Sequence, residues 1–350
     1  QDGSDIRPAG ATIIAEGEHS MFLWGPNKYS DAPTLYVTPS TGSSDGPGTI
    51  TQPYDTLKNA WNANRFSLEN ATIILTEPGL YDINQLGSAN GNEAWVTISA
   101  SPELNQEDPN DLVVLHTTAT RNGEKISDWT TINSKALHFK NLCFEQTILQ
   151  RLQPNGNDVY FWYENTYHTD AEGRFGDSPR GYGQINSNLK RIAVYYDGCR
   201  FYDRKQGAGG GTISRNSNYT KIADNDVFSG TALLLDNTAS DIRLSAESDA
   251  HIDVWQLTGS NYVYPMMRNK ICFGLRAWDC GHTQPILLDK TRSEFSRIAI
   301  VDVANEGNPP GEPEGINIMS IADHIFMSNC SFDHFLGFLG VGGFSVPSSN

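Results

Sequence analysis

TLYVTPSTGSSDGPGTITQPYDTLKNAWNA, residues 34–63, is followed by ATIILTEPGLYDI at residues 71–83. The first stretch predicts a strand over residues 35–38, then a turn rich in Gly, Ser, Asp and Pro, then a short helix after Pro53. Leu57, Ala60 and Trp61 are spaced i, i+3, i+4, which gives this helix one apolar face. The second stretch predicts a strand that ends at a Pro-Gly turn. The order strand, helix, strand marks the start of the main body of the chain.

The series YVTP…DGPGT…QPYDTLKNAW…ATIILTEPGLYD resembles the N-terminal signature of secreted right-handed parallel β-helix proteins, the pectate-lyase-like superfamily. The resemblance covers residues 34–100 and identifies no specific family. It implies an all-β fold, a single-stranded right-handed parallel β-helix whose open end is capped by a helix at residues 54–63. It also implies a secreted or extracellular protein. The superfamily contains lyases, hydrolases, epimerases and phage tailspikes, so the reaction stays open.

A repeat in the rest of the chain predicts the same architecture independently. Short apolar strands alternate with corners rich in Asn, Asp and Gly, and Phe201 and Phe228 are 27 residues apart. Cys280 and Cys330 are 50 residues apart, which corresponds to two coils of 25. A strand-rich repeat of this length predicts a β-solenoid. A sandwich or propeller is the alternative, but few two-residue Asn-Gly or Asp-Gly hairpin links are present.

The chain divides into an entry segment and one long domain. Residues 1–33 are expected to pack on the solenoid, which comprises residues 34–350. Residues 150–190 are polar and rich in aromatic side chains, so we expect them to emerge as a loop on one face. Trp162 and Tyr163 in this loop are candidate ligand contacts, with a small aromatic core as the alternative.

Charge and composition exclude several partners. Lys and Arg total 25 against 41 Asp and Glu, so the formal net charge is −16. This charge disfavours nucleic acid and anionic membranes, which bind basic patches. No run of about 18 apolar residues is present, so insertion into a membrane is not expected. The five cysteines have no CxxC spacing and predict neither a zinc site nor a disulfide scaffold.

The segment SDAHIDVWQ, residues 248–256, carries the predicted site. Side chains alternate along a strand, so His251, Asp253 and Trp255 share one face, which we expect to point outward. The other face, which ends at Gln256, is expected to point into the core.

Residues one coil apart stack in a parallel solenoid, so a coil of 25 residues defines the neighbours of this segment. It places Arg276 beside His251 and Trp278 beside Asp253. The following corner and the next coil supply four more polar candidates. These are Asp279, His282, Lys290 and Arg292.

Such a patch suits a polysaccharide, because Trp rings stack on the apolar faces of sugars while charged groups bind hydroxyls and uronates. The predicted binding residues are Trp255, Trp278, His282, Arg292, Trp162 and Tyr163. A lyase needs a base, for which the candidates are His251 and Lys290. It also needs a cation to stabilise the enolate, and Arg276 and Arg292 are the candidates for this role.

A glycoside hydrolase needs two carboxyl groups instead, and Asp253 with either Asp279 or Asp236 is the candidate pair. The sequence therefore predicts a secreted protein that binds and cleaves an acidic or marine-type polysaccharide, with lyase and hydrolase both open. The rival class is a non-enzymatic carbohydrate-binding tailspike, adhesin or filament module with the same fold. Both a monomer and a homotrimer fit.

No cofactor other than calcium is a candidate. Asn305 and Glu306, in the acidic stretch ANEGNPPGEPEG at residues 304–315, are possible oxygen ligands for Ca²⁺. A solvated loop rich in Pro and Gly is the alternative.

Overall fold

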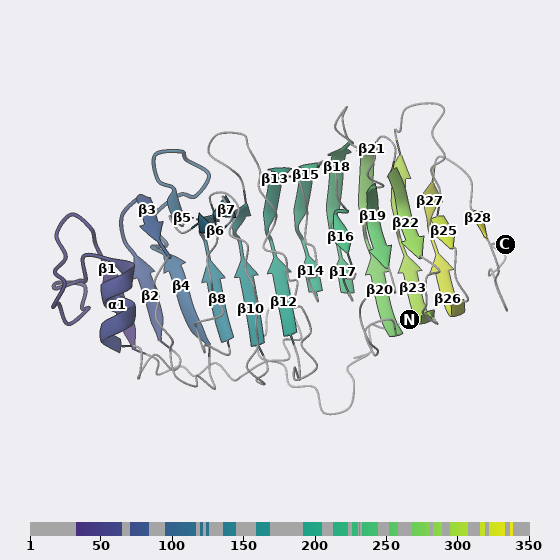
Figure 1. Cartoon of the computed structure of the whole chain (residues 1–350). Helices are drawn as coiled ribbons and strands as arrows, with labels where there is room; N and C mark the ends of the chain where they lie inside the picture. The colour runs from purple at the N-terminus through teal and green to yellow at the C-terminus, as the bar shows by residue number, and fades with distance from the viewer. Residues whose placement is uncertain are drawn as a thin grey trace.

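The computed structural model describes about half of the chain in separate ranges: residues 33–64, 71–83, 95–116, 120–121, 124–125, 136–144, 159–168, 192–204, 213–222, 226–229, 231, 233–243, 252–257, 268–280, 283–288, 295–306, 316–318, 322–332 and 337–338. These residues form long parallel sheets and one helix, consistent with the predicted parallel β-solenoid (Figure 1). No helix among them is long and apolar enough to cross a membrane.

The strands belong to three parallel sheets. Sheet 1 consists, in spatial order, of β1 (Thr34–Val37), β2 (Thr72–Leu75), β4 (Val96–Ala100), β8 (Ala136–Lys140), β10 (Val159–Glu164), β12 (Ile192–Asp197), β14 (Ile213–Arg215), β17 (Leu233–Leu235), β20 (Arg268–Phe273), β23 (Phe295–Val301) and β26 (Ala322–Ser328). Sheet 2 consists of β3 (Gly79–Asp82), β5 (Val113–His116), β9 (Cys143–Phe144), β11 (Tyr167–His168), β13 (Arg200–Arg204), β15 (Asn218–Ile222), β18 (Thr238–Ile242), β21 (Arg276–Cys280), β24 (Ala304–Glu306) and β27 (Ser331–Phe332).

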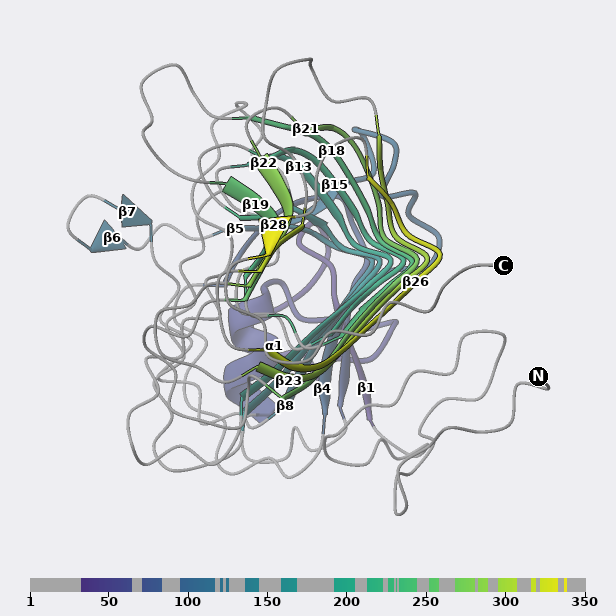
Figure 2. The same ribbon diagram turned by 90° about the vertical axis from the view of Figure 1, so that its right-hand side faces the viewer.

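Sheet 3 consists of β16 (Phe228–Ser229), β19 (Ile252–Leu257), β22 (Thr283–Leu288), β25 (Ile316–Ile318) and β28 (Gly337–Phe338). Sheets 1 and 2 meet at a common corner, and sheet 3 lies across from that corner (Figure 2). A short antiparallel pair, β6 (Thr120–Arg121) and β7 (Glu124–Lys125), stands apart from these sheets.

The predicted helix is present as α1 (Leu57–Asn64), with Leu57, Ala60 and Trp61 all buried. It begins three residues later than expected, because the hydroxyl of Thr56 accepts a hydrogen bond of 3.1 Å from the backbone N–H of Asn59 and so caps the helix. The helix lies beside β1 at one end of the stack (Figure 1).

The corner between sheets 1 and 2 is built the same way in eight successive coils. One residue there adopts a left-handed backbone with φ between 49° and 69°, a conformation that Gly, Asn and Asp tolerate best. The corner residues are Asn141, Asn165, Gly198, Asn216, Asp236, Gly274, Asp302 and Asn329. The Asn-, Asp- and Gly-rich corners expected from the sequence therefore have a conformational cause.

Coil length is not constant, in contrast to the 25 residues expected. The corner residues Gly198 and Asn216 are 18 positions apart, whereas Asp236 and Gly274 are 38 apart. The longest interval contains β19, a strand of sheet 3. The strands stack in register although the number of residues per coil varies. A single fixed coil length therefore cannot predict which residues of successive coils are neighbours.

Inside the solenoid, rings stack from rung to rung. Phe144, His168, Phe201 and Tyr219 form a column in sheet 2 with successive centroid distances of 5.0, 4.4 and 4.5 Å. Such stacking adds to the stabilisation from apolar burial. Four of the five cysteines are also buried, and all five are free thiols.

The loop expected over residues 150–190 is wrong for residues 159–168, which form β10 and β11 in sheets 1 and 2. The run VYFWYE of β10 alternates, with Phe161 and Tyr163 buried and Trp162 half-buried. Because both faces of this strand carry aromatic residues, the two-residue alternation of a strand is not visible as an alternation of apolar and polar residues in the sequence. The rest of that stretch, like the entry segment 1–32, lies outside the described residues.

Candidate functional site

Asp253 and Trp255 do not form the outward row expected of them. Both are completely buried in β19, where Asp253 pairs with Gln284 and Trp255 pairs with Ile286 of β22. The indole N–H of Trp255 donates to the carbonyl oxygen of Thr231 at 3.2 Å. The predicted orientation of this strand is therefore wrong, because its aromatic face fills the core, and Gln256 is half-buried on the other face.

Arg276 and Trp278 lie together on β21 of sheet 2, as the strand pattern predicted, and Asp279, which was expected at the following corner, belongs to the same strand. Their neighbours differ from those expected, because Trp278 pairs with Ser240 of β18 and not with Asp253. The residues predicted to form one patch therefore lie on two sheets: Asp253 and Trp255 belong to sheet 3, and Arg276 and Trp278 belong to sheet 2.

The remaining predicted site residues lie in the core, on sheet 1 or outside the described residues. Tyr163 is completely buried and stacks between Phe139 and Tyr196 at centroid distances of 5.3 and 5.2 Å. Trp162 stacks on His138 at 3.9 Å on sheet 1. Four predicted residues fall outside the described part of the chain: His251, His282, Lys290 and Arg292.

Trp278 belongs to a straight column of outward-facing residues on sheet 2. The strand register aligns Tyr202 with Thr220, Thr220 with Ser240, and Ser240 with Trp278. Tyr202 is 37% and Trp278 is 44% exposed, whereas Ser240 between them is buried. We call these four residues the ring column. It runs across β13, β15, β18 and β21, which stand side by side in Figure 1.

Ionic groups border the ring column at Trp278. Arg243 contacts Asp241 through Nε at 2.5 Å and Asp279 through Nη2 at 2.7 Å. The hydrogen bond that Arg243 donates to Asp241, followed by the charges of both carboxylates, raises the pKa of Arg243 above its usual value. Asp241 and Asp279 both have a left-handed backbone, so the chain bends at the same place in the two rungs.

The other side of the column is bordered by hydroxyl, amide and guanidinium groups. Asn218 donates through Nδ2 to Thr238 Oγ1 at 2.6 Å, and its Oδ1 accepts from Thr220 at 2.8 Å. Arg276 donates to Asp302 Oδ2 at 2.7 Å and to the backbone oxygen of Asp302. The face therefore presents donors and acceptors next to two exposed rings.

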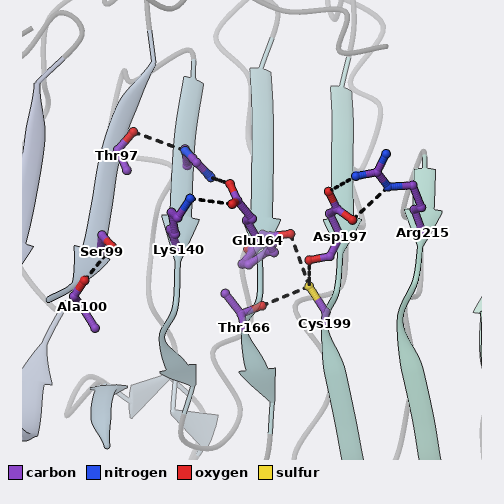
Figure 3. A network of polar contacts seen from close by, with 11 residues as sticks. Thr97, Ser99, Ala100, Lys140, Glu164, Thr166, Asp197, Cys199 and Arg215 are labelled. Carbon is purple, nitrogen blue, oxygen red and sulfur yellow. Dashed lines mark hydrogen bonds and ion pairs between the residues drawn. The ribbon is translucent and has the colours of Figure 1, made fainter. Parts of the chain in front are cut away.

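A second polar cluster lies on sheet 1 (Figure 3). Glu164 receives hydrogen bonds from Lys140 Nζ at 2.6 Å and from the His138 ring at 2.9 Å, and Arg215 binds Asp197 through two contacts of 3.0 and 2.5 Å. These groups occupy neighbouring rungs and satisfy one another. The exposed fractions of Glu164, Asp197 and Arg215 are only 20%, 15% and 11%.

The Glu164 carboxyl is held ionised. Burial opposes its charge, but the hydrogen bond and charge of His138, then those of Lys140, outweigh burial and lower the pKa to about 2. A general acid of a glycoside hydrolase needs a raised pKa instead. We therefore assign this cluster to holding rungs together, and the ring column is the candidate ligand site.

Calcium finds no support in the described residues. No group of three or more His, Cys, Asp or Glu side chains there is arranged to hold a metal ion. Asn305 and Glu306 belong to β24 of sheet 2, where Glu306 pairs with Trp278. Residues 307–315 of the acidic stretch lie outside the described residues.

Tyr202, Thr220 and Ser240 are candidate site residues that the sequence alone did not indicate. Their segments, RFYD and NYTK among them, have the strand alternation that predicts one outward residue each. Only the register, which depends on unequal coil lengths, aligns them with Trp278. A scan against protein-family models and a search of curated proteins give no match to this chain.

Proposed function

We propose that this chain is an extracellular right-handed, single-stranded parallel β-helix that binds a polysaccharide on the outer face of sheet 2. The supporting observation is the ring column, in which Tyr202 and Trp278 are exposed in one straight line with hydroxyl side chains between them. Parallel pairing throughout the three sheets supports the fold part of the proposal.

The chemistry of this face matches the surface of a sugar. The rings offer flat apolar area for the C–H faces of pyranoses, and exposed indoles and phenols are frequent in binding surfaces. Paired guanidinium and carboxylate groups offer donors and acceptors for hydroxyls, as Arg243 with Asp241 and Asp279 illustrates. Extracellular location is part of the same proposal, because polysaccharides are found there.

The test is binding of wild type and Trp278→Ala to a polysaccharide panel of cellulose, xylan, polygalacturonate and alginate, by affinity electrophoresis and calorimetry. We expect the variant to bind its polymer about tenfold more weakly, the equivalent of about 1.4 kcal/mol. Phe326→Ala is the matched control, because Phe326 is a 51% exposed ring on sheet 1. Equal affinity of wild type and Trp278→Ala would contradict the proposal, as would no binding to any polymer.

We also propose that the protein cleaves the bound polymer. Binding alone fits an enzyme and an adhesin equally, so the products have to be measured. A lyase produces unsaturated uronates that absorb ultraviolet light together with new reducing ends, and a hydrolase produces reducing ends only. His251→Ala and Lys290→Ala test the two predicted bases. Binding without either product identifies a non-enzymatic module, and light scattering decides between monomer and homotrimer.

A further inference from the structure

We infer that the ligand of sheet 2 is a neutral polysaccharide that lies along the solenoid axis, across the strands. This inference rests on the proposed function and adds the direction and the chemical class of the ligand. Three features of the ring column and its border carry it: the separation of the two rings, the small residues between them and the pairing of the surrounding arginines.

The separation of the rings sets the direction. Tyr202 on β13 and Trp278 on β21 are three strand spacings apart, about 14 Å at roughly 4.8 Å per spacing. A chain that contacts both rings must cross β15 and β18. A chain aligned with β21 would meet Trp278 and Arg276 but not Tyr202.

The residues between the rings leave this path open. Thr220 is half-buried and Ser240 is buried, and their hydroxyls lie 3.3 Å apart. Thr220 and Ser240 therefore place no bulky side chain between the two larger exposed rings. A linear oligosaccharide that stacks at both ends therefore meets hydroxyl groups in the middle, where its own hydroxyls find partners.

The pairing of the arginines sets the charge of the ligand. Arg200 contacts Glu107, Arg243 contacts Asp241 and Asp279, and Arg276 contacts Asp302, so each of these cations already has a carboxylate. A polyanion would have to displace those carboxylates in a chain of net charge −16. Neutral hydroxyls can accept from the arginines and donate to the carboxylates without separating them.

One contact has to change when the ligand binds. The ammonium group of Lys221 lies 4.9 Å from the centroid of the Tyr202 ring. Lys221 is exposed, and a cation–π contact at an exposed site is weak. A sugar can therefore replace the lysine on this ring.

The direction is tested with cello- and xylo-oligosaccharides of increasing length, titrated by calorimetry into wild type, Tyr202→Ala, Trp278→Ala and the double variant. We expect the affinity of wild type to rise with length until both rings are covered and then to level off. Each single variant should bind long oligosaccharides no better than short ones, and the double variant should lose binding. Full affinity of Tyr202→Ala beside a weakened Trp278→Ala would overturn the axial direction while leaving the proposed function standing.

The class is tested by comparing those neutral ligands with oligogalacturonates of matched length at low and high salt. We expect the neutral series to bind with an affinity that salt does not change. Binding of the oligogalacturonates alone, weakening as salt rises, would overturn the neutral assignment. Unchanged binding of all ligands by both single variants would instead refute the proposed site.

Discussion

At the scale of the residue, Trp255 and Trp278 show how burial separates a core side chain from a candidate for ligand contact. Trp255 is completely buried and Trp278 is 44% exposed, although both were predicted to bind ligand. The same distinction applies to ionic groups. Glu164 is largely buried and held by His138 and Lys140, whereas the paired Arg243 and Asp279 beside the ring column are exposed.

Glu164→Gln should lower stability in a pH-dependent way. The folded pKa of about 2 lies below the unfolded value of 4.5, so the contribution of Glu164 is complete above pH 4.5 and disappears as the pH falls towards 2. A shift of this size corresponds to stabilisation on the order of 3 kcal/mol. Urea midpoints should differ clearly from wild type at pH 6 and converge near pH 2.

The control for this variant is Glu107→Gln, because Glu107 is 65% exposed in its contact with Arg200. Exposed ion pairs contribute about 0–1 kcal/mol, so this control should stay close to wild type at both pH values. A difference between Glu164→Gln and wild type that is the same at pH 6 and pH 2 would contradict the assignment.

At the scale of the element, the corner between sheets 1 and 2 depends on residues that tolerate a left-handed backbone. Gly274 has φ +69°, and a Cβ atom there would lie 2.2 Å from Asp236 Oδ1 and 3.2 Å from Asp236 Cα. Hydrogen bonds link the corners, since Gly274 N donates to Val301 O at 3.1 Å and Asp236 N to Phe273 O at 2.9 Å. Each corner therefore supports its two neighbours.

Gly274→Ala should destabilise the protein by more than the roughly 1–2 kcal/mol that the left-handed conformation alone costs, because the added methyl group collides with Asp236. Combining it with Asp236→Gly should restore part of the loss. Gly79→Ala is the control for backbone strain without a collision, since that glycine has φ +138° with no atom within 4 Å of an added Cβ. Thermal melts compare the melting temperatures of these variants with that of wild type. A melting temperature of Gly274→Ala equal to that of wild type would contradict the prediction.

At the scale of the whole molecule, the described chain is a stack in which each rung contacts mainly its neighbours. Stability in such a stack is approximately a sum of rung and interface contributions, so the ends matter. α1 covers the end that begins at β1, with Trp61 completely buried (Figure 1). Damage to this helix should therefore act locally.

Trp61→Ala should open the N-terminal rungs while the distant ones remain protected. A buried Trp replaced by Ala costs about 3–5 kcal/mol, and that loss falls on β1 and β3, which contact the helix, and on β2, which pairs with β1. Hydrogen exchange followed by mass spectrometry should show faster exchange over residues 34–82 and unchanged exchange over residues 295–332. Uniformly faster exchange would indicate a single cooperative unit instead.

Local pattern in the sequence predicted the parts of this protein that depend on local physics. The spacing of Leu57, Ala60 and Trp61 predicted the helix, and the short strands with Asn, Asp and Gly corners predicted a parallel solenoid. Alternation also showed that Arg276 and Trp278 share a face. These features follow from the 3.6 and 2.0 residue periods of the backbone.

Only the tertiary structure decided which strands are neighbours and which face is buried. A period of two residues tells which side chains share a face but not which face points inward, and β19 carries large side chains on the face that turned out to be the core. Coils of 18 to 38 residues close onto the same stack, because loops absorb the difference. Trp278 therefore pairs with Ser240 and shares a column with Tyr202, an alignment that requires the register of four strands.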